Sequence, residues 1–406
     1  MKPGWQIKKI GEVCQIRGGG TPSKAISKYW QGDIPWVSPK DMKFDIVSDS
    51  IDHITAEAVA KSATSVIPKG SMLMVVRSGI LANTVPLAIT GRELTVNQDL
   101  KAICPSQSLT VRFLYYFLKS KMNELLSMVS RGATVHRLMT DQIRDIEILV
   151  PPIAEQQRIV AILDEAFAGI ATAKANAEKN LQNSRALFES HLDAVFSCQN
   201  EKWLESQLQT ITTKIGSGAT PRGGEAAYKS EGISLIRSLN VHDMGFRYEK
   251  LAFLDDAQAN DLSNVVLEPN DVLLNITGAS VARCCIAPID VLPARVNQHV
   301  SIIRPVPEEL DSRFLHYLLI SGPYKKHLLQ TGEEGGSTRQ ALTKAQIQAL
   351  KIRYPNTLKV QLEIVGKLDS FLEKTQHLEA IYKKKLIALE ELKKSLLHQA
   401  FDGELG

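Results

Sequence analysis

Two long stretches of the chain carry apolar residues at steps of three and four positions. Residues 154–196 contain no proline and one isolated glycine, Gly169. Residues 358–401 repeat the pattern, and from Leu368 to Leu396 the steps approach a heptad. This spacing places apolar side chains along one face of an α-helix. A helix of about 43 residues would be about 65 Å long, so we expect each helix to bury its stripe against the other. Two unrelated surface helices, each packed on its own domain, are the alternative.

The seam between these helices can be predicted residue by residue. Its expected positions in the first helix are Ile159, Leu163, Ile170, Leu181 and Leu192. Its expected positions in the second helix are Leu368, Leu372, Tyr382, Leu389 and Leu396, within a stripe that also includes Val365, Leu378, Leu386 and Leu392. One turn of the second stripe lacks an apolar residue in register.

The segments that precede the two helices have a different pattern. Short apolar runs at residues 71–76 and 271–276 are bounded by Gly, Pro, Asn and Asp, which predicts strands joined by tight turns. Helical spacing in these segments is confined mainly to residues 109–128 and 309–329. We therefore predict an α+β fold with two tandem mixed domains and two long helices. The expected boundaries, marked by prolines after each domain, are a domain at 1–152, a helix at 153–198, a second domain at 199–356, and a helix with its tail at 357–406.

The sequence repeats itself at an offset of about 200 residues. Thr21-Pro22 returns as Thr220-Pro221, and Val96-Asn97-Gln98 returns as Val296-Asn297-Gln298. A solenoid has units of roughly 20–50 residues, so this longer period indicates a duplicated domain together with its connecting helix. Two such copies form a pseudo-twofold object, which suggests two related tasks at a fixed separation.

Composition and charge add little beyond excluding several classes of protein. The 406 residues are 44% hydrophobic and 23% charged, with a net charge of +4. No apolar run is long enough to span a membrane, and we expect a cytoplasmic protein. The five cysteines lack metal-ligand spacing and are expected to be reduced. Residues 1–150 hold 19 Lys and Arg against 13 Asp and Glu, which permits DNA binding through local patches.

The motifs of nucleotide-dependent and hydrolytic enzymes are absent. The glycine-rich loop at residues 18–24 lacks the second glycine of a P-loop, and Pro22 removes a backbone donor from it. No Rossmann fingerprint, adenine methyltransferase motif or HExxH zinc motif occurs, and Asp41-Met42-Lys43 is the one nuclease-like spacing. We predict no catalytic site and no metal site in this chain.

Taken together, the repeated motifs resemble the specificity subunit of type I restriction–modification systems. The resemblance covers essentially the whole chain. Its motifs are Gly19-Gly20-Thr21-Pro22 and the variant Gly218-Ala219-Thr220-Pro221, the strand Ile34-Pro35-Trp36, the two Val-Asn-Gln triplets, the strand from Ile146 to Pro152, and the LxxSLLxxAFxGEL ending from Leu392 to Leu405. The second copy departs from the first at Ala219 and at Leu235, which stands where Trp36 stands in the first copy.

This resemblance implies a fold, a function and partners. It implies two target recognition domains, each of which reads one half of an asymmetric bipartite site on double-stranded DNA, and an antiparallel coiled coil that sets the spacer. It also implies a non-catalytic subunit that binds two methyltransferase (M) subunits, which carry S-adenosylmethionine and methylate adenine N6, and restriction (R) subunits that use ATP and Mg²⁺. No cofactor is expected in this chain itself. The alternatives are a coiled-coil scaffold that bridges proteins without reading DNA and a self-sufficient nuclease or methylase.

Side chains that contact DNA should be forked or small polar donors on exposed loops. In the first domain the candidates are Thr21, Ser23, Lys24, Lys28, Lys40, Arg77, Arg131, Thr134, His136 and Arg137. In the second domain they are Thr220, Arg222, Lys229, Arg237, Asn240, Thr277, Arg283, Thr338, Arg339 and Gln340.

Other polar and aromatic residues are assigned structural or partner-binding roles. The repeated Asn97-Gln98 and Asn297-Gln298 are interpreted as turn or core hydrogen-bonding residues, because side chains that read different bases should differ between the copies. Trp30 and Trp36 are expected to be buried. The candidates for M-subunit contact are Gln156, Gln157, Arg158, Phe188 and residues 401–405.

Overall fold

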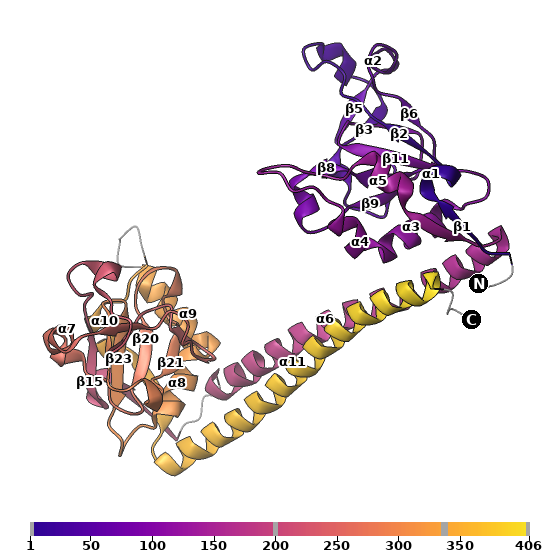
Figure 1. Ribbon diagram of the computed structural model, residues 1–406. Coiled ribbons are helices and arrows are strands. Elements are labelled where there is room, and N and C mark those ends of the chain that lie inside the picture. Colours follow the sequence, from indigo (N-terminus) through magenta and orange to yellow (C-terminus); the bar gives the residue numbers. More distant parts are fainter. Residues whose placement is uncertain (1–3, 198–201, 334–339, 403–406) are drawn as a thin grey trace. The chain divides into compact units, whose positions relative to one another are not determined.

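The computed structural model describes residues 4–197, 202–333 and 340–402. Its contacts divide the chain into two units, Met1–Ala177 with Lys384–Gly406 and Glu178–Lys383. The division runs through two long helices, α6 (Ile153–Ser197) and α11 (Leu358–Phe401). Each unit therefore contains one mixed domain and a part of both helices (Figure 1).

The domain of unit 1 is built on a five-stranded and a four-stranded sheet. The strand order is β2-β11-β7-β9-β4 in the first and β5-β3-β10-β6 in the second, and β1-β13 and β12-β8 form two-stranded pairs. The strands are β1 (Gln6–Lys9), β2 (Cys14–Gly18), β3 (Ile34–Val37), β4 (Ile46–Val47), β5 (Asp52–Ile54), β6 (Val66–Ile67), β7 (Met72–Val75), β8 (Arg77–Ser78), β9 (Leu87–Thr90), β10 (Leu94–Val96), β11 (Leu100–Pro105), β12 (His136–Arg137) and β13 (Glu147–Val150). The helices are α1 (Ile10–Val13), α2 (Ala56–Ala60), α3 (Val111–Ser120), α4 (Met122–Ser127) and α5 (Thr140–Asp145).

The domain of unit 2 repeats this plan with fewer strands among its described residues. Its larger sheet has the order β15-β23-β20-β21 and its smaller sheet the order β19-β16-β22, with the pairs β14-β24 and β17-β18. The strands are β14 (Trp203–Gln207), β15 (Thr212–Ser217), β16 (Ile233–Ile236), β17 (Val241–His242), β18 (Gly245–Phe246), β19 (Ala252–Leu254), β20 (Val272–Asn275), β21 (Cys284–Ile286), β22 (Ala294–Val296), β23 (Val300–Pro305) and β24 (Lys351–Pro355). The helices are α7 (Asp256–Asp261), α8 (Ser312–Ile320), α9 (Gly322–Glu333) and α10 (Lys344–Ala349).

The central strand pair has the same register in both units. In unit 1, β11 runs antiparallel to β7 and Leu100 faces Val75. In unit 2, β23 runs antiparallel to β20 and Val300 faces Asn275. Both residues shift by 200 positions between the units, so the repeated sequence folds into a repeated sheet. The predicted α+β class with two tandem mixed domains is confirmed.

In each domain, one helix packs against the C-terminal end of one of the two long helices, which we call the spacer helices. In unit 1, Phe113 of α3 meets Phe401 of α11 with ring centroids 5.1 Å apart. In unit 2, Phe314 of α8 meets Phe196 of α6 at 5.4 Å. Burial of such rings contributes to the core of each unit, and the hydrophobic cluster of each unit includes residues from both spacer helices.

The two long helices face each other within each unit, as the heptad spacing predicts. Of the predicted seam residues, Ile159 and Leu163 are buried in the hydrophobic core of unit 1, Leu192 and Leu368 are buried in the core of unit 2, and Ile170 is buried on α6. The remaining predicted seam residues are half-buried, namely Leu181, Leu372, Tyr382, Leu389 and Leu396.

Ion pairs between the helices show that they run antiparallel. Lys174 Nζ lies 2.6 Å from Glu390 Oε1 in unit 1, and Arg185 Nε lies 3.1 Å from Glu379 Oε2 in unit 2. From the first pair to the second, the residue number increases by 11 on α6 and decreases by 11 on α11. The pairing register is therefore the same in both units.

Two members of the predicted apolar stripe lie outside the seam. Leu378 is 37% exposed and Leu392 is 47% exposed. Thr375 is 2% exposed and occupies the turn that lacked an apolar residue; its Oγ1 donates a 2.9 Å hydrogen bond to Leu372 O. A threonine can be buried there because its hydroxyl is satisfied by its own helix.

A buried glutamine ties each spacer helix to its domain. Gln156 Oε1 accepts from Thr110 N, and its Nε2 donates to Ser108 O and Pro151 O, all at 2.8 Å. Gln361, 205 positions later, makes the corresponding bonds to the backbone of residues 309, 311 and 355. The expectation that Gln156 contacts an M subunit is wrong, because its side chain is fully buried.

Phe188 is likewise buried in the core of unit 2, against Tyr317, and so is not a partner contact. Gln157 remains exposed, and Arg158 forms an ion pair with Glu155 on its own helix. Among the described residues, no helix is long and apolar enough to cross a membrane.

Candidate nucleic-acid interface

Four loops that are far apart in the sequence meet at one place in the mixed domain of unit 1, which we call domain 1. Thr21 Oγ1, in the glycine-rich loop, donates a 2.5 Å hydrogen bond to Gln98 Oε1. Arg77 Nε lies 2.9 Å from Asp99 Oδ1. Strand β8 pairs with β12, which places Arg137 opposite Arg77. The predicted segments around residues 21, 77 and 131–137 therefore form one cluster, together with residues 97–99.

This cluster is basic and exposed. Arg131, Thr134 and Arg137 are exposed, and the Arg77 side chain is 44% exposed. The loop depends on Gly132, because a Cβ at that position would lie 2.4 Å from Val135 O. Cationic side chains on a tight exposed loop are suited to phosphate contacts and to hydrogen bonds with base edges.

Domain 2, the mixed domain of unit 2, forms the corresponding cluster, in which the threonine and the glutamine are the same and the residues at positions 277 and 299 differ. Thr220 Oγ1 donates to Gln298 Oε1, as Thr21 does to Gln98. Thr277 Oγ1 and His299 Nδ1 are joined by a 2.5 Å hydrogen bond. The backbone N of Gly278 donates to Gln340 O at 3.0 Å.

Thr277, His299 and Gln340 line a depression in the surface of domain 2. Its lining consists of Ser238, Leu239, Thr277, Gly278, Ala279, Ser280, Arg283, His299, Gln340 and Ala341. Three of the candidate DNA-contact residues, Thr277, Arg283 and Gln340, thus lie together. The candidates Thr338 and Arg339 are outside the described residues.

Three predicted lysines form exposed ion pairs with nearby carboxylates. Lys28 pairs with Glu57 at 3.0 Å, Lys40 with Asp52 at 2.8 Å, and Lys229 with Asp255 at 3.1 Å. Exposed pairs of this kind stabilise a protein by at most about 1 kcal/mol, so a phosphate could replace the carboxylate at low cost. Ser23, Lys24 and Arg222 are exposed on the opening loops, and His136 is half-buried.

Two predicted DNA contacts in domain 2 are engaged within the protein. Asn240 is fully buried, and its Nδ2 donates to Arg247 O at 2.8 Å. Arg237 donates to Glu225 Oε1 at 2.8 Å and to Lys250 O at 2.6 Å, and its guanidinium lies over the Tyr228 ring. These side chains hold the loop that contains β17 and β18, and we do not include them in the interface proposed below.

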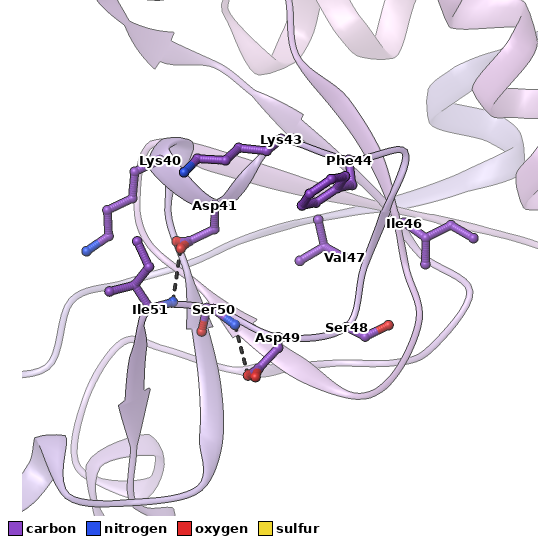
Figure 2. Close-up of a pocket in the computed structure, with 10 residues that line it drawn as sticks. All are labelled: Lys40, Asp41, Lys43, Phe44, Ile46, Val47, Ser48, Asp49, Ser50 and Ile51. Carbon is purple, nitrogen blue, oxygen red and sulfur yellow. Dashed lines mark hydrogen bonds between the residues drawn. The ribbon is translucent and has the colours of Figure 1, made fainter. Parts of the chain in front are cut away.

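The loop at residues 40–51 of domain 1 forms a shallow apolar pocket (Figure 2). Phe44 is 75% exposed there, and Ile46 and Ile51 are also exposed. Asp41 Oδ1 accepts a 3.0 Å bond from Ile51 N, as Figure 2 shows, while its Oδ2 accepts from Ser38 N at 2.8 Å. Asp41, the first residue of the nuclease-like spacing, therefore acts as a turn-stabilising group.

The repeated Asn-Gln pairs combine structural and surface roles. Asn97 and Asn297 are buried, and each Oδ1 accepts a 3.0 Å bond from the backbone two residues on. The interpretation of these asparagines as turn residues is confirmed. The sequence reasoning missed the residue that follows each triplet, Asp99 in domain 1 and His299 in domain 2. Asp99 and His299 differ between the two copies although each directly follows the repeated Val-Asn-Gln triplet, and this difference is the signal that could have identified them.

Trp36 is buried as expected, and its Nε1 donates a 2.9 Å bond to Gly20 O, while Trp30 packs edge-on against it at 5.0 Å. Burial raises the pKa of the Cys14 and Cys285 thiols to about 12. Among the described residues, no three His, Cys, Asp or Glu side chains are grouped so that they could hold a metal ion.

Comparison with known proteins identifies the family. A model of the family described as the type I restriction modification DNA specificity domain matches residues 2–182 and 200–389. The two matches cover most of the chain, which therefore belongs to this family.

Individual relatives agree with this assignment. The chain is 37% identical over 192 residues to the specificity subunit of type I restriction enzyme EcoR124I/EcoR124II from Escherichia coli, an alignment that spans 47% of this chain and 48% of that subunit. It is 27% identical over 319 residues to the MjaIX specificity subunit of Methanocaldococcus jannaschii, covering 74% of this chain and 72% of that one. The chain thus spans about half the length of the first relative and more of the second.

Solved structures share the fold. A chain from a study of the assembly of a type I restriction–modification system is similar with a TM-score of 0.77 at 19% identity, covering 100% of this chain and 99% of that chain. The HsdS subunit from Thermoanaerobacter tengcongensis has a TM-score of 0.61 at 18% identity, covering 100% and 98%.

Proposed function

We propose that this chain is the non-catalytic specificity subunit of a type I restriction–modification complex and that it reads an asymmetric, bipartite DNA sequence. The observation that carries the proposal is the pair of equivalent polar clusters, at residues 21, 77, 98 and 99 and at residues 220, 277, 298 and 299. Their backbone frame and the threonine–glutamine contact are the same, whereas Arg77 and Asp99 of domain 1 are replaced by Thr277 and His299 in domain 2. Each domain would therefore present a similar surface to DNA and read a different half-site.

The DNA contacts in domain 1 would come from the exposed loops. Ser23, Lys24, Arg131 and Arg137 are exposed and available for phosphates. Thr21 would exchange its bond to Gln98 for a phosphate, as Lys28 and Lys40 would exchange their carboxylate partners. Arg77, Thr134 and His136 lie in the same cluster. In domain 2 the corresponding set is Thr220, Arg222, Lys229, Thr277, Arg283 and Gln340.

The paired helices would keep the two half-sites apart. Helices of 45 and 44 residues with a heptad seam are stiff elements, and the antiparallel ion pairs at Lys174 and Arg185 support a single register. A constant number of unread base pairs between the half-sites follows from this arrangement.

The chemistry would be performed by partner subunits. Two M subunits would supply adenine N6 methylation with S-adenosylmethionine, and R subunits would supply ATP- and Mg²⁺-dependent restriction. This chain would select the site at which they act. The exposed Gln157, beside the buried Gln156, is a candidate for M-subunit contact.

DNA affinity of the purified complex with M subunits tests this proposal. The double variant R131A/R137A removes two exposed cations from the cluster, whereas R144A removes an exposed cation on α5 that pairs with Asp141. Each phosphate contact contributes about 0.9 to the slope of log affinity against log salt. We expect the slope to fall by about 1.8 in R131A/R137A and to remain unchanged in R144A. Equal slopes for the double variant and the wild type would contradict the proposed interface, and absence of DNA binding by the wild-type complex would favour the scaffold alternative.

A further inference from the structure

The loops that carry the two polar clusters share one backbone frame. In domain 1, Val76 N donates to Asp99 O at 2.8 Å; in domain 2, Ile276 N donates to His299 O at 2.9 Å. On the opposite side, Leu138 N donates to Val76 O at 2.9 Å, as Leu342 N does to Ile276 O at 2.8 Å. The backbone at positions 77 and 99 of domain 1 is therefore held as it is at positions 277 and 299 of domain 2.

A different pair of side chains stands on each copy of this frame. Domain 1 carries the ion pair between Arg77 and Asp99. Domain 2 carries the hydrogen bond between Thr277 and His299. Both members of the pair change together, whereas the neighbouring contact of a threonine with a glutamine is kept in both domains. The frame is constant and the paired side chains are the variable part.

We propose that the residue pairs Arg77–Asp99 and Thr277–His299 determine the base that each domain selects at one position of its half-site. This inference rests on the proposed function, and it assigns Asp99 and His299 a role in DNA recognition that the sequence did not suggest. Asp99 acts as a positioning residue, since it would hold Arg77 without contacting the base.

The geometry of domain 1 favours guanine. Asn97 Nδ2 donates a 3.0 Å bond to Asp99 Oδ2, which fixes the carboxylate, and the other carboxylate oxygen faces Arg77 Nε. The ion pair uses Nε and leaves the two Nη groups of a 44% exposed guanidinium to act as a fork. Such a fork fits the O6 and N7 acceptors of guanine in the major groove.

The pair Thr277–His299 of domain 2 cannot provide this fork. A threonine hydroxyl offers one O–H donor and a neutral imidazole offers one N–H donor, so neither side chain presents two parallel donors. His299 Nε2 also lies 3.1 Å from Gln298 Nε2, so the imidazole is held on both sides. Domain 2 should therefore lack a guanine preference at the equivalent position of its half-site.

Exchange of the pairs tests the inference. The variants R77T/D99H and T277R/H299D place each pair on the other frame, and R144T serves as a matched control outside the cluster. Each full-length chain is assembled with its M subunits and incubated with a library of random DNA, and the methylated molecules are sequenced. We expect R77T/D99H to lose a guanine preference of about 5- to 150-fold at one position of one half-site, leaving the other half unchanged. T277R/H299D should gain guanine at one position of the other half.

Two single variants keep the test valid if an exchanged chain does not fold. R77K keeps the charge and removes the fork, and D99N keeps the shape and removes the carboxylate charge. Both variants should weaken the guanine preference at the same position without changing the other half-site.

A motif that is unchanged in every variant would overturn the inference, as would a uniform loss of methylation on all sequences by folded R77K. Failure of the proposed function is distinguishable, because the wild-type complex would then yield no bipartite motif at all.

Discussion

Replacement of the buried glutamine at the start of α6 should destabilise unit 1 strongly. The variant Q156M keeps the length of the side chain and removes an amide that bonds three backbone groups at 2.8 Å. A hydrogen bond contributes about 1 kcal/mol on balance, and a buried group left unpaired costs about 1–3 kcal/mol. Three lost bonds therefore predict a loss of about 3 kcal/mol. Gln157, exposed on the same helix turn, provides the matched control Q157M.

Thermal unfolding of the full chain, followed by calorimetry and circular dichroism, measures this effect. A change of 1 kcal/mol shifts the melting temperature of a unit of this size by roughly 2–4 °C, so Q156M should lower the transition of unit 1 by about 6–12 °C. Q157M should melt within about 1 °C of the wild type, since exposed substitutions change stability by less than about 0.5 kcal/mol. If Q156M and Q157M melt together, the buried amide does not hold the helix to its domain.

Further predictions concern the seam, the pH dependence and the thiols. Leu163→Ala, at a predicted seam position that is buried in the core of unit 1, should cost about 2–5 kcal/mol in denaturant unfolding, whereas Leu392→Ala should cost less than about 0.5 kcal/mol. Equal costs would contradict the packing of Leu163 in this core. Burial lowers the pKa of His316, so the unfolded chain binds more protons than the folded chain, and stability should fall as the pH drops below about 6.5. The variant H316Q should flatten this part of the stability profile. A profile that H316Q leaves unaltered would refute the role of His316. Burial raises the pKa of the Cys284 thiol well above its usual value. This thiol should therefore resist alkylation at pH 8 in the folded chain and react in denaturant. Equal alkylation rates in both states would show that the thiol is accessible in the folded chain.

The spacing of apolar residues was sufficient to predict the architecture. The strands β7 and β20 and the helices α3 and α8 lie inside the segments indicated by pattern alone. Helix α6 begins at Ile153, and α11 begins at Leu358, one residue after the predicted boundary. A long periodic segment constrains the fold because every turn of the helix must place an apolar residue on the same face.

The polar members of the core were not predictable in this way. Gln156 is buried because its partners lie near residue 109, and Asn240 is buried because its amide meets carbonyls near residue 248. Thr375 enters the seam because its hydroxyl bonds to the preceding turn. The burial of Gln156 in particular depends on contacts with a segment more than 40 residues away, which no local pattern records.

The candidate site was predicted better by segment than by residue. The segments at 77–79 and 131–137 were selected separately, and the structure pairs them as β8 and β12. Arg237 was selected for its type, yet its donors are taken up by Glu225 and Lys250. Whether an arginine faces solvent or a carboxylate depends on the fold around it, which residue type alone does not specify.

A map of N6-methyladenine in cells that express this chain with its M subunit tests the central claim most directly. The account predicts a motif with two unlike halves separated by a constant number of unread base pairs. Exchange of residues 1–150 for the same region of a related specificity subunit should change one half and leave the other half and the gap intact. Methylation by an active M subunit without any bipartite motif, or a motif that is unaltered by the exchange, would contradict the claim that this chain selects the site.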